Sequence, residues 1–407
     1  LALLLYPSDT TTSSFLSVQW SIPMYRAPTV ALANQYGANN GYPTQDATPR
    51  LLGDFNGDGI PDIYAFGISG LQISLGSSDF TFNPTPINVG YWDSQAGYTS
   101  FNDCPRYIGD FNGDGKSDIW GWKPDPNGGR NAQICEFGLN NGSGFDITPV
   151  DCFVNYWNNW NTDQLFPKAI GDINGDGKDD VVLFGISDIY IGISTGTDFV
   201  HSTQRLGKYN YGTYWGLTSD NPRFLGDVNG DGKADIVGYG GDGVWVTLSE
   251  GTTFGTPSNW DNFGVGAAWP SQWSTPRYLI DFTGDGKADL YGFSADEVAS
   301  RYSLTNHFSY DAYLSQRYFI HSAGWTNTNI QPKFPARFAG ETYAVIIGFG
   351  EDNVEISTYD DAGWQESLAQ TQFQKHQSSC HISPHQFSFR YFNKFNPQDF
   401  LFLYYLL

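Results

Sequence analysis

The sequence predicts an all-β fold, a seven-bladed β-propeller built of four-stranded antiparallel blades. Three observations lead to this prediction. A nine-residue acidic string recurs along the chain, short strand-like apolar runs flank each copy, and no segment shows the 3.6-residue apolar period of a capped helix. Repetition of one small strand-rich unit around a ring is how propellers are built.

The acidic string has the form Asp-x-Asn-Gly-Asp-Gly-x-x-Asp. Four copies begin at Asp54, Asp110, Asp172 and Asp227, and a fifth begins at Asp281 with threonine at its third position. An apolar run precedes each copy, and a run of aliphatic, aromatic and glycine residues follows it. Both runs are typical of strands bounded by turns, so the string is predicted to be the hairpin loop between the first two strands of a blade.

The strand-like units add up to seven blades in one domain that spans residues 1–407. The predicted blades are residues 49–104, 105–166, 167–221, 222–275, 276–334 and 335–383, with a seventh assembled from residues 384–407 as inner strands and residues 1–48 as outer strands. Pairing of N-terminal and C-terminal strands would close the ring. A linear solenoid is the competing arrangement, but solenoids have capping ends rather than complementary half-units. Whether residues 1–6 form a strand or the remnant of a leader stays open.

The acidic loops predict up to five Ca²⁺ sites. Carboxylate, amide or hydroxyl oxygens stand at positions 1, 3, 5 and 9 of each string, and position 7 can offer a backbone carbonyl. Hard oxygen ligands on a flexible loop suit Ca²⁺ better than Mg²⁺. The predicted ligands are Asp54, Asn56, Asp58, Ile60 and Asp62; Asp110, Asn112, Asp114, Lys116 and Asp118; Asp172, Asn174, Asp176, Lys178 and Asp180; Asp227, Asn229, Asp231, Lys233 and Asp235; and Asp281, Thr283, Asp285, Lys287 and Asp289.

Two other interpretations of the loops fit the sequence less well. They could be solvated acidic turns, but fivefold recurrence of oxygen donors at fixed spacing argues against this. They are not EF-hands, because position 12 carries no glutamate in any copy and strands rather than helices flank the loop.

The repeated unit resembles the FG-GAP (VCBS-type) repeat of integrin α-subunit propellers. Within that group it is most similar to the fungal, seven-bladed, integrin-like lectins of the Psathyrella velutina lectin type, which bind N-acetylglucosamine. The resemblance is good over residues 49–293, weaker over 335–357 and poor at both ends. It implies a cation loop between the first two strands of each blade. It also implies a secreted, multivalent, calcium-stabilised lectin for N-acetylglucosamine-type or related glycans.

The segments between blades are rich in aromatic residues, glycine, asparagine and aspartate, which is typical of sugar sites. Flat rings match the CH faces of sugars, and amide or carboxylate oxygens match the hydroxyls. The candidate carbohydrate-binding residues are Trp92, Tyr98, Trp157, Trp160, Tyr214, Trp215, Trp269, Trp273 and Trp325. The competing interpretation is that these rings pack between blades.

Charge and composition restrict the function further. The formal net charge of −22 makes a nucleic-acid partner a poor expectation. The sequence contains no run of 18 apolar residues, so it predicts no membrane-spanning helix. Outside the acidic loops we find no nucleophile or acid–base set, so we predict a binding protein rather than an enzyme. Glycans or glycoproteins are the expected partners, and an integrin-like adhesion or structural propeller that binds a protein is the alternative.

The chain has four cysteines, which permit disulfides without demanding them. The simplest pairing is Cys135 with Cys152 on neighbouring strands of one blade, although the connectivity and the oligomeric state stay open.

Overall fold

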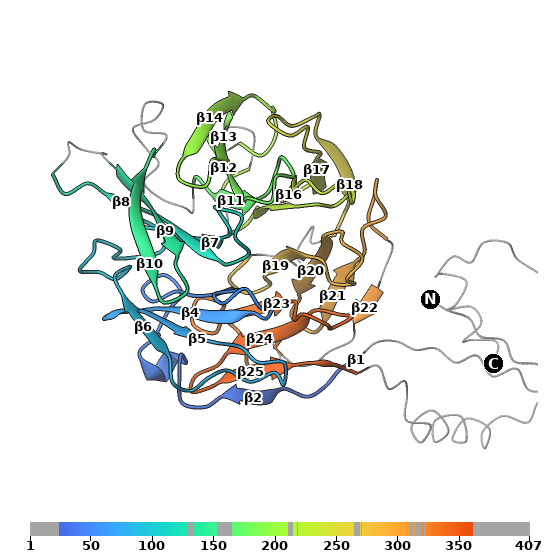
Figure 1. Ribbon diagram of the computed structural model, residues 1–407. Helices are drawn as coiled ribbons and strands as arrows, with labels where there is room; N and C mark the ends of the chain where they lie inside the picture. The colour runs from blue at the N-terminus through green and yellow to red at the C-terminus, as the bar shows by residue number, and fades with distance from the viewer. Residues whose placement is uncertain are drawn as a thin grey trace, which may run out of the picture. The chain divides into compact units, whose positions relative to one another are not determined.

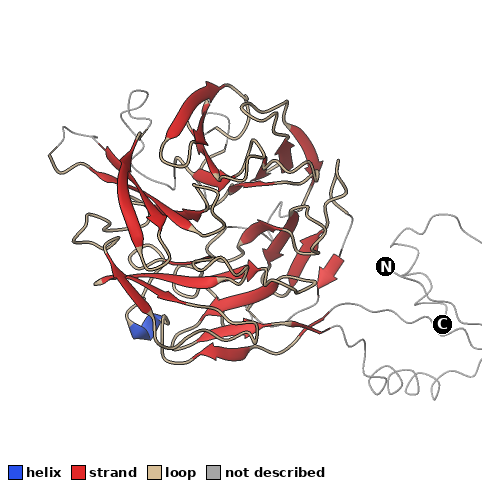
Figure 2. Ribbon diagram, viewed as in Figure 1, coloured by secondary structure: helices blue, strands red, loops and turns tan. Residues whose placement is uncertain are grey.

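A computed structural model of the chain describes residues 24–360, except 128–132, 153–164, 211–214, 218, 264–268, 270, 310–311, 315–318 and 321–322. Within these residues the fold is all-β, as predicted, and six sheets of four antiparallel strands form the blades of a propeller (Figure 1, Figure 2). The one helix in this part of the chain is the short 3₁₀ turn η1 (Ala38–Asn40). No described helix is long and apolar enough to cross a membrane.

Each blade uses four strands, and the first strands of neighbouring blades contact one another at the centre. The first blade is β3 (Arg50–Gly53), β4 (Asp62–Gly67), β5 (Gly70–Ser74) and β6 (Ile87–Gly90), and the second is β7 (Arg106–Gly109), β8 (Asp118–Pro124), β9 (Gln133–Asn140) and β10 (Phe145–Val150). The third is β11 (Lys168–Gly171), β12 (Asp180–Phe184), β13 (Ile189–Ser194) and β14 (Phe199–Gln204). The fourth is β15 (Arg223–Gly226), β16 (Asp235–Gly240), β17 (Gly243–Thr247) and β18 (Ser258–Asp261). The fifth is β19 (Arg277–Ile280), β20 (Asp289–Phe293), β21 (Val298–Arg301) and β22 (Ala312–Leu314). The sixth is β23 (Lys333–Ala336), β24 (Val345–Phe349), β25 (Val354–Ser357) and β2 (Thr29–Leu32), and a separate pair joins β1 (Met24–Tyr25) to β26 (Tyr359–Asp360).

The predicted number of seven blades is wrong: residues 24–360 form six. β2, expected as an outer strand of a seventh blade, pairs antiparallel with β25 and places Val30 opposite Glu355. It thereby becomes the fourth strand of the sixth blade. An N-terminal strand does complete a late blade, but one blade earlier than predicted. Residues 384–407, the predicted inner strands of the seventh blade, lie outside the described residues.

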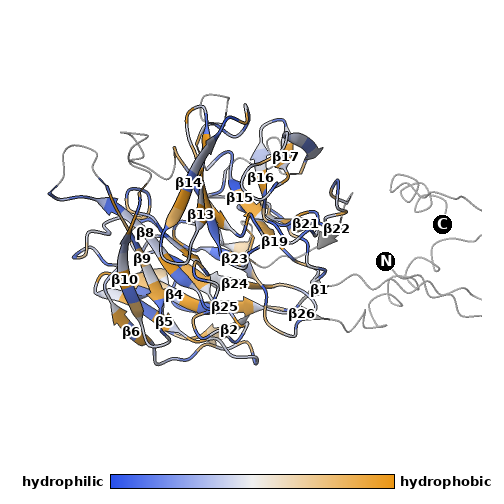
Figure 3. Ribbon diagram, turned by 45° about the horizontal axis from the view of Figure 1, so that its top comes forward, coloured by the Kyte–Doolittle hydropathy of each residue, from blue (hydrophilic) through white to orange (hydrophobic). Residues whose placement is uncertain are grey.

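Burial on both faces explains why the central strands form. Every residue of β16 and β24 is buried. Neighbouring blades share their cores, as where Trp120 of β8 packs in one cluster with Val181 and Leu183 of β12. Figure 3 shows hydrophobic residues along the strands. A disulfide between Cys135 and Cys152 confirms the simplest pairing expected from the sequence.

A buried cation that follows a proline opens the first strand of every blade. The six cations are Arg50, Arg106, Lys168, Arg223, Arg277 and Lys333. Arg106, for example, donates to the carbonyl of Trp92 (3.0 Å), and its guanidinium lies 5.1 Å from the centre of the Phe66 ring. Lys333 donates to the carbonyls of Phe319 and Trp325. Such contacts fix the segment that enters a blade to the blade's first strand.

Candidate functional site

The five acidic strings lie where they were predicted, in the turns between the first and second strands. In the first loop the Asp54 carboxylate accepts hydrogen bonds from the backbone N–H groups of Gly57 and Gly59, both at 2.7 Å. Both glycines have positive φ values of 76° and 77°, a conformation that glycine adopts without strain. The same bonds recur in the loops that begin at Asp110, Asp172, Asp227 and Asp281.

The aspartate at position 9 is fully buried in every loop. In the first loop Asp62 accepts the backbone N–H of Phe55 (2.7 Å) and that of Gly76 (2.7 Å), so it ties the loop to the end of the third strand. Burial, with the nearby charges of Asp54 and Asp58, raises the pKa of Asp62 to about 7. Burial is likewise the main cause that raises the pKa to about 7 at the four equivalent residues, Asp118, Asp180, Asp235 and Asp289.

Four of the loops carry a lysine at position 7, and the first loop does not. Its ammonium pairs with the position-5 aspartate, as in Lys178–Asp176 at 2.8 Å and Lys233–Asp231 at 3.0 Å. The loops containing Lys116 and Lys287 show the same pairing. The first loop carries Ile60 at this position and gains no such internal counter-charge.

The donor chemistry and the charge of the loops fit a hard cation. Each loop carries carboxylate and amide or hydroxyl oxygens, and burial raises the pKa of the position-9 carboxyl, so a bound cation would favour its ionised form. Backbone N–H groups occupy part of these carboxylates, and no group of three His, Cys, Asp or Glu side chains forms a ready-made metal site in the described part of the chain. Ca²⁺, which tolerates irregular geometry and mixed oxygen donors, suits such a set.

Hydrogen bonds join the loops of neighbouring blades. The carbonyl of Asp54 accepts the N–H of Ser117 (2.6 Å) from the second loop, and Asp110 accepts from Asp179 (2.7 Å) of the third in the same way. The N–H of Ala339, in the sixth blade, donates to the Gly59 carbonyl (2.9 Å) of the first loop. The candidate cation loops therefore contact one another from blade to blade.

Most of the predicted sugar-binding rings that the structure describes are buried instead. Trp92 is 0% and Tyr98 1% exposed, and the two ring centres lie 5.0 Å apart. Both rings lie against the α-carbon of Gly121 in β8, where even a methyl group would collide with them. A glycine inside a strand often marks such a close approach.

The same aromatic pair, six residues apart, recurs in other blades. The pairs are Tyr36 with Tyr42, Trp92 with Tyr98, Tyr209 with Trp215, Phe263 with Trp269, and Phe319 with Trp325. For Trp215, Trp269 and Trp325 the packing interpretation therefore describes the ring's main contacts. Trp273 differs because it is 44% exposed and presents its ring to solvent. Trp157, Trp160 and Tyr214 lie outside the described residues.

A polar cluster in the fourth blade was not predicted from the sequence. Trp245 of β17 stands opposite Gly238 in the strand pairing, and its indole N–H donates to Asp242 (2.9 Å). The Lys208 ammonium lies 3.5 Å from the centre of the Trp245 ring and 3.2 Å from the Asp242 carboxylate. The side chain of Asp242 is 62% exposed. An indole, a carboxylate and an ammonium thus meet at the surface.

The second blade carries a related cluster at the same register. Glu136 of β9, opposite Gly121, accepts from the hydroxyl groups of Tyr91 (3.0 Å) and Tyr98 (2.9 Å) and pairs with Lys123 (2.8 Å). Tyr91 is 38% exposed. The residue opposite the strand glycine therefore differs between these blades, whereas the aromatic frame, the pair of rings six residues apart that packs on this glycine, recurs. No sequence motif marks these clusters, because strand pairing assembles them from separate segments.

The model of the FG-GAP-like repeat matches residues 54–121 and 227–292. Each segment includes two acidic loops and the strands that flank them. The chain carries FG-GAP-like repeats. This agrees with the resemblance noted in the sequence, although the six blades of residues 24–360 differ from the seven of the Psathyrella velutina lectin type.

Solved structures with this fold include a lectin. The chain is similar to a lectin of Agrocybe aegerita that specifically recognises non-reducing terminal N-acetylglucosamine, with 26% identity, a TM-score of 0.60, and coverage of 80% of this chain and 83% of the lectin. It is also similar to part of the Tc holotoxin pore of Photorhabdus luminescens, with 17% identity, a TM-score of 0.54, and coverage of 84% of this chain but 15% of the toxin chain. The second likeness concerns the fold alone. None of the curated protein sequences matches the chain.

Proposed function

We propose that the chain is a secreted, multivalent, calcium-stabilised lectin that binds glycans ending in N-acetylglucosamine or a related sugar. One observation carries the proposal: the fold similarity to the Agrocybe aegerita lectin, which extends over most of both chains at 26% identity. FG-GAP-like repeats support a propeller built for binding, and we propose binding rather than catalysis as its activity.

The exposed cluster of Lys208, Asp242 and Trp245, with the exposed residues Tyr91 and Trp273, forms the glycan surfaces that we propose. A sugar hydroxyl can donate to the Asp242 carboxylate, and the Lys208 ammonium can donate to a sugar oxygen. The exposed ring of Trp273 offers an apolar surface to a pyranose. Since the frame repeats around the ring, weak single sites would combine into strong binding to a multivalent glycan. The variable residue opposite the strand glycine makes these sites unequal.

Calcium has a structural part in this proposal. A cation bound in each acidic loop would offset the buried charge at position 9 and hold together the first two strands of a blade. Because the loops contact one another, a cation that orders one loop would also stabilise the loop of the neighbouring blade. A ligand that binds the folded state alone raises its stability.

A glycan array probed with the full chain, with Ca²⁺ and with a chelator, tests the proposal. We expect binding to glycans with terminal N-acetylglucosamine and competition by the free sugar. Asp242→Asn should weaken monosaccharide binding at its site by about tenfold, since a hydrogen bond to a charged group contributes ~1.5–3 kcal/mol. Asp296→Asn, at an exposed aspartate outside the clusters, is the matched control.

The array also distinguishes the alternative. A folded, Ca²⁺-loaded chain that binds no glycan on the array would refute the lectin. If it binds an unglycosylated protein instead, the adhesion propeller is favoured.

A further inference from the structure

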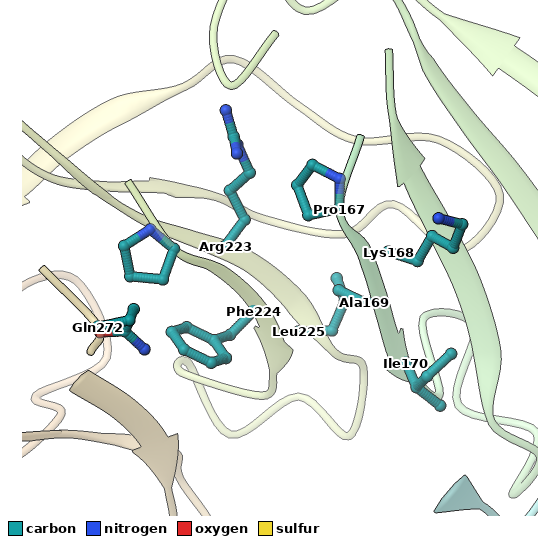
Figure 4. Close-up of a pocket in the computed structure, with 9 residues that line it drawn as sticks. Pro167, Lys168, Ala169, Ile170, Arg223, Phe224, Leu225 and Gln272 are labelled. Carbon is teal, nitrogen blue, oxygen red and sulfur yellow. The ribbon is translucent and has the colours of Figure 1, made fainter. Parts of the chain in front are cut away.

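A cavity of about 270 Å³ lies between the first strands of the third and fourth blades (Figure 4). Its walls come mainly from Pro167, Ala169 and Ile170 on β11 and the segment before it, and from Pro222, Phe224 and Leu225 on the β15 side. Figure 4 shows the Pro167 ring, Ala169 and the Phe224 ring around the open space. The cavity is partly open to solvent, so a ligand can enter.

One small residue accounts for the cavity. The second residue of each first strand occupies the same pairing position in all six blades. These residues are Leu51, Tyr107, Ala169, Phe224, Tyr278 and Phe334. Five blades therefore carry a large apolar or aromatic side chain at this position, and the third blade carries a methyl group.

The interface between the fifth and sixth blades shows what is missing. There the Tyr278 and Phe334 rings, which hold this position in consecutive blades, lie 6.0 Å apart in an edge-to-face arrangement. The Tyr278 hydroxyl also donates to the carbonyl of Lys333. At the interface between the third and fourth blades, Phe224 has the methyl group of Ala169 in place of a second ring. A flat ring from a ligand would supply the contact that Tyr278 makes in the fifth blade.

The polar side chains near the cavity form hydrogen bonds with other groups of the protein. The Lys168 ammonium donates to the Phe166 carbonyl (3.1 Å) and lies 5.3 Å from the centre of a Trp122 ring. Arg223 donates to the Trp215 carbonyl. The Gln272 amide is engaged by the backbone of Arg277, with bonds of 2.7 and 2.9 Å. What faces the space is therefore mostly apolar, and two buried cations close by disfavour a cationic ligand.

We propose that this cavity binds a small, uncharged molecule with one flat apolar ring, in a site separate from the glycan surfaces. The volume permits this, since an apolar cavity of ~150 Å³ already holds benzene. An aromatic pair stabilises by ~0.5–1.5 kcal/mol beyond the area that it buries, so packing against Phe224 would add to the burial of the ring.

Titration of the full chain with benzyl alcohol, followed by calorimetry or ligand-observed NMR, tests the proposal. We expect one site per chain, with weaker binding of the charged counterparts benzoate and benzylammonium. Ala169→Phe places a ring at the position against Phe224 that the ligand ring would take, and should weaken benzyl alcohol binding by about tenfold or more, because close-packed atoms cannot occupy one position. Glycan binding should be unchanged, so a negative result for benzyl alcohol leaves the lectin proposal standing.

Two further variants keep the test decisive. Val200→Phe adds the same ring at an exposed edge position, 62% exposed, and should bind benzyl alcohol as the parent chain does. If Ala169→Phe does not fold, Ala169→Leu fills the space with the side chain that the first blade uses. No binding to the parent chain, or equal binding to the parent and a folded Ala169 variant, would overturn the site.

Discussion

The aspartate that ends each acidic loop links charge to stability. Its carboxylate is enclosed and accepts at least two backbone N–H groups, yet burial still raises its pKa to about 7 in all five loops. A folded-state pKa above the unfolded value means that the native chain binds more protons than the unfolded chain between those two values. The free energy of unfolding must therefore fall as the pH rises through this window.

We accordingly expect the chelated chain to lose thermal stability from about pH 4 to about pH 7, since the five carboxylates must ionise while buried. Saturating Ca²⁺ should reduce or reverse the loss, because the cation favours the ionised form. Melting curves across this range, with chelator and with Ca²⁺, measure both effects. If the melting temperature of the chelated chain rises over the same range, ionisation of these buried carboxylates does not control its stability.

The sequence alone did not show whether the aromatic rings of the inter-blade segments are exposed or buried. The composition of the inter-blade segments is equally compatible with exposed and with buried rings, because aromatic residues suit sugars and cores alike. The deciding signal lies elsewhere in the chain, in strand glycines such as Gly121 and Gly238 on which the rings pack. Only the strand pairing shows that these glycines meet Trp92 and Trp215.

At the scale of the element, the position of each acidic hairpin and of its two strands was predictable. Its glycines and aspartates determine the turn locally, so the loop and its two strands form where the sequence places them. The Lys–Asp pairs inside four of the loops do not follow from the ligand pattern, in which position 7 contributes only its backbone carbonyl. This pairing makes the five loops unequal in charge.

We expect Ile60→Lys to weaken Ca²⁺ binding at the first loop by roughly two- to fivefold, since an exposed ion pair that must be broken contributes ~0.2–1 kcal/mol. The new ammonium would compete with the cation for Asp58. Calorimetric titration with Ca²⁺ measures the change. Ile68→Lys, which adds the same charge at a position 70% exposed and outside the loop, should leave binding unaltered. Equal affinities in both variants would show that position 7 does not tune the loop.

At the scale of the whole molecule, the blade number could have been read from a signal that strand counting overlooked. Proline followed by a cation occurs six times in the sequence, once before each first strand. A count of strand-like runs overestimates the number of blades, because it does not show which strand pairs with which. β2, for example, pairs with β25 in the sixth blade instead of belonging to a seventh. Non-local pairing is the part of a propeller that local patterns do not encode.

A cysteine pair tests the six-bladed closure directly. Val30 and Glu355 stand opposite each other in β2 and β25. Directly paired residues of antiparallel strands lie ~4.5–5.5 Å apart, within reach of a disulfide. Val30→Cys with Glu355→Cys should therefore cross-link on oxidation, which non-reducing mass analysis detects. Val30→Cys with Thr148→Cys, in the second blade, should not. Absence of the first cross-link in a folded chain would overturn the pairing of β2 with β25.

The strand that completes the sixth blade also sets the order of events during synthesis. The contact between Arg26 and Ser357 joins residues 331 positions apart, so the ring has no closed form until residue 357 has left the ribosome. Until then β2 stays an unpaired strand, and contacts of such long range are slow to form. An open sheet edge is prone to pair with another chain. Newly made molecules would therefore be most vulnerable to aggregation in the interval before β25 emerges.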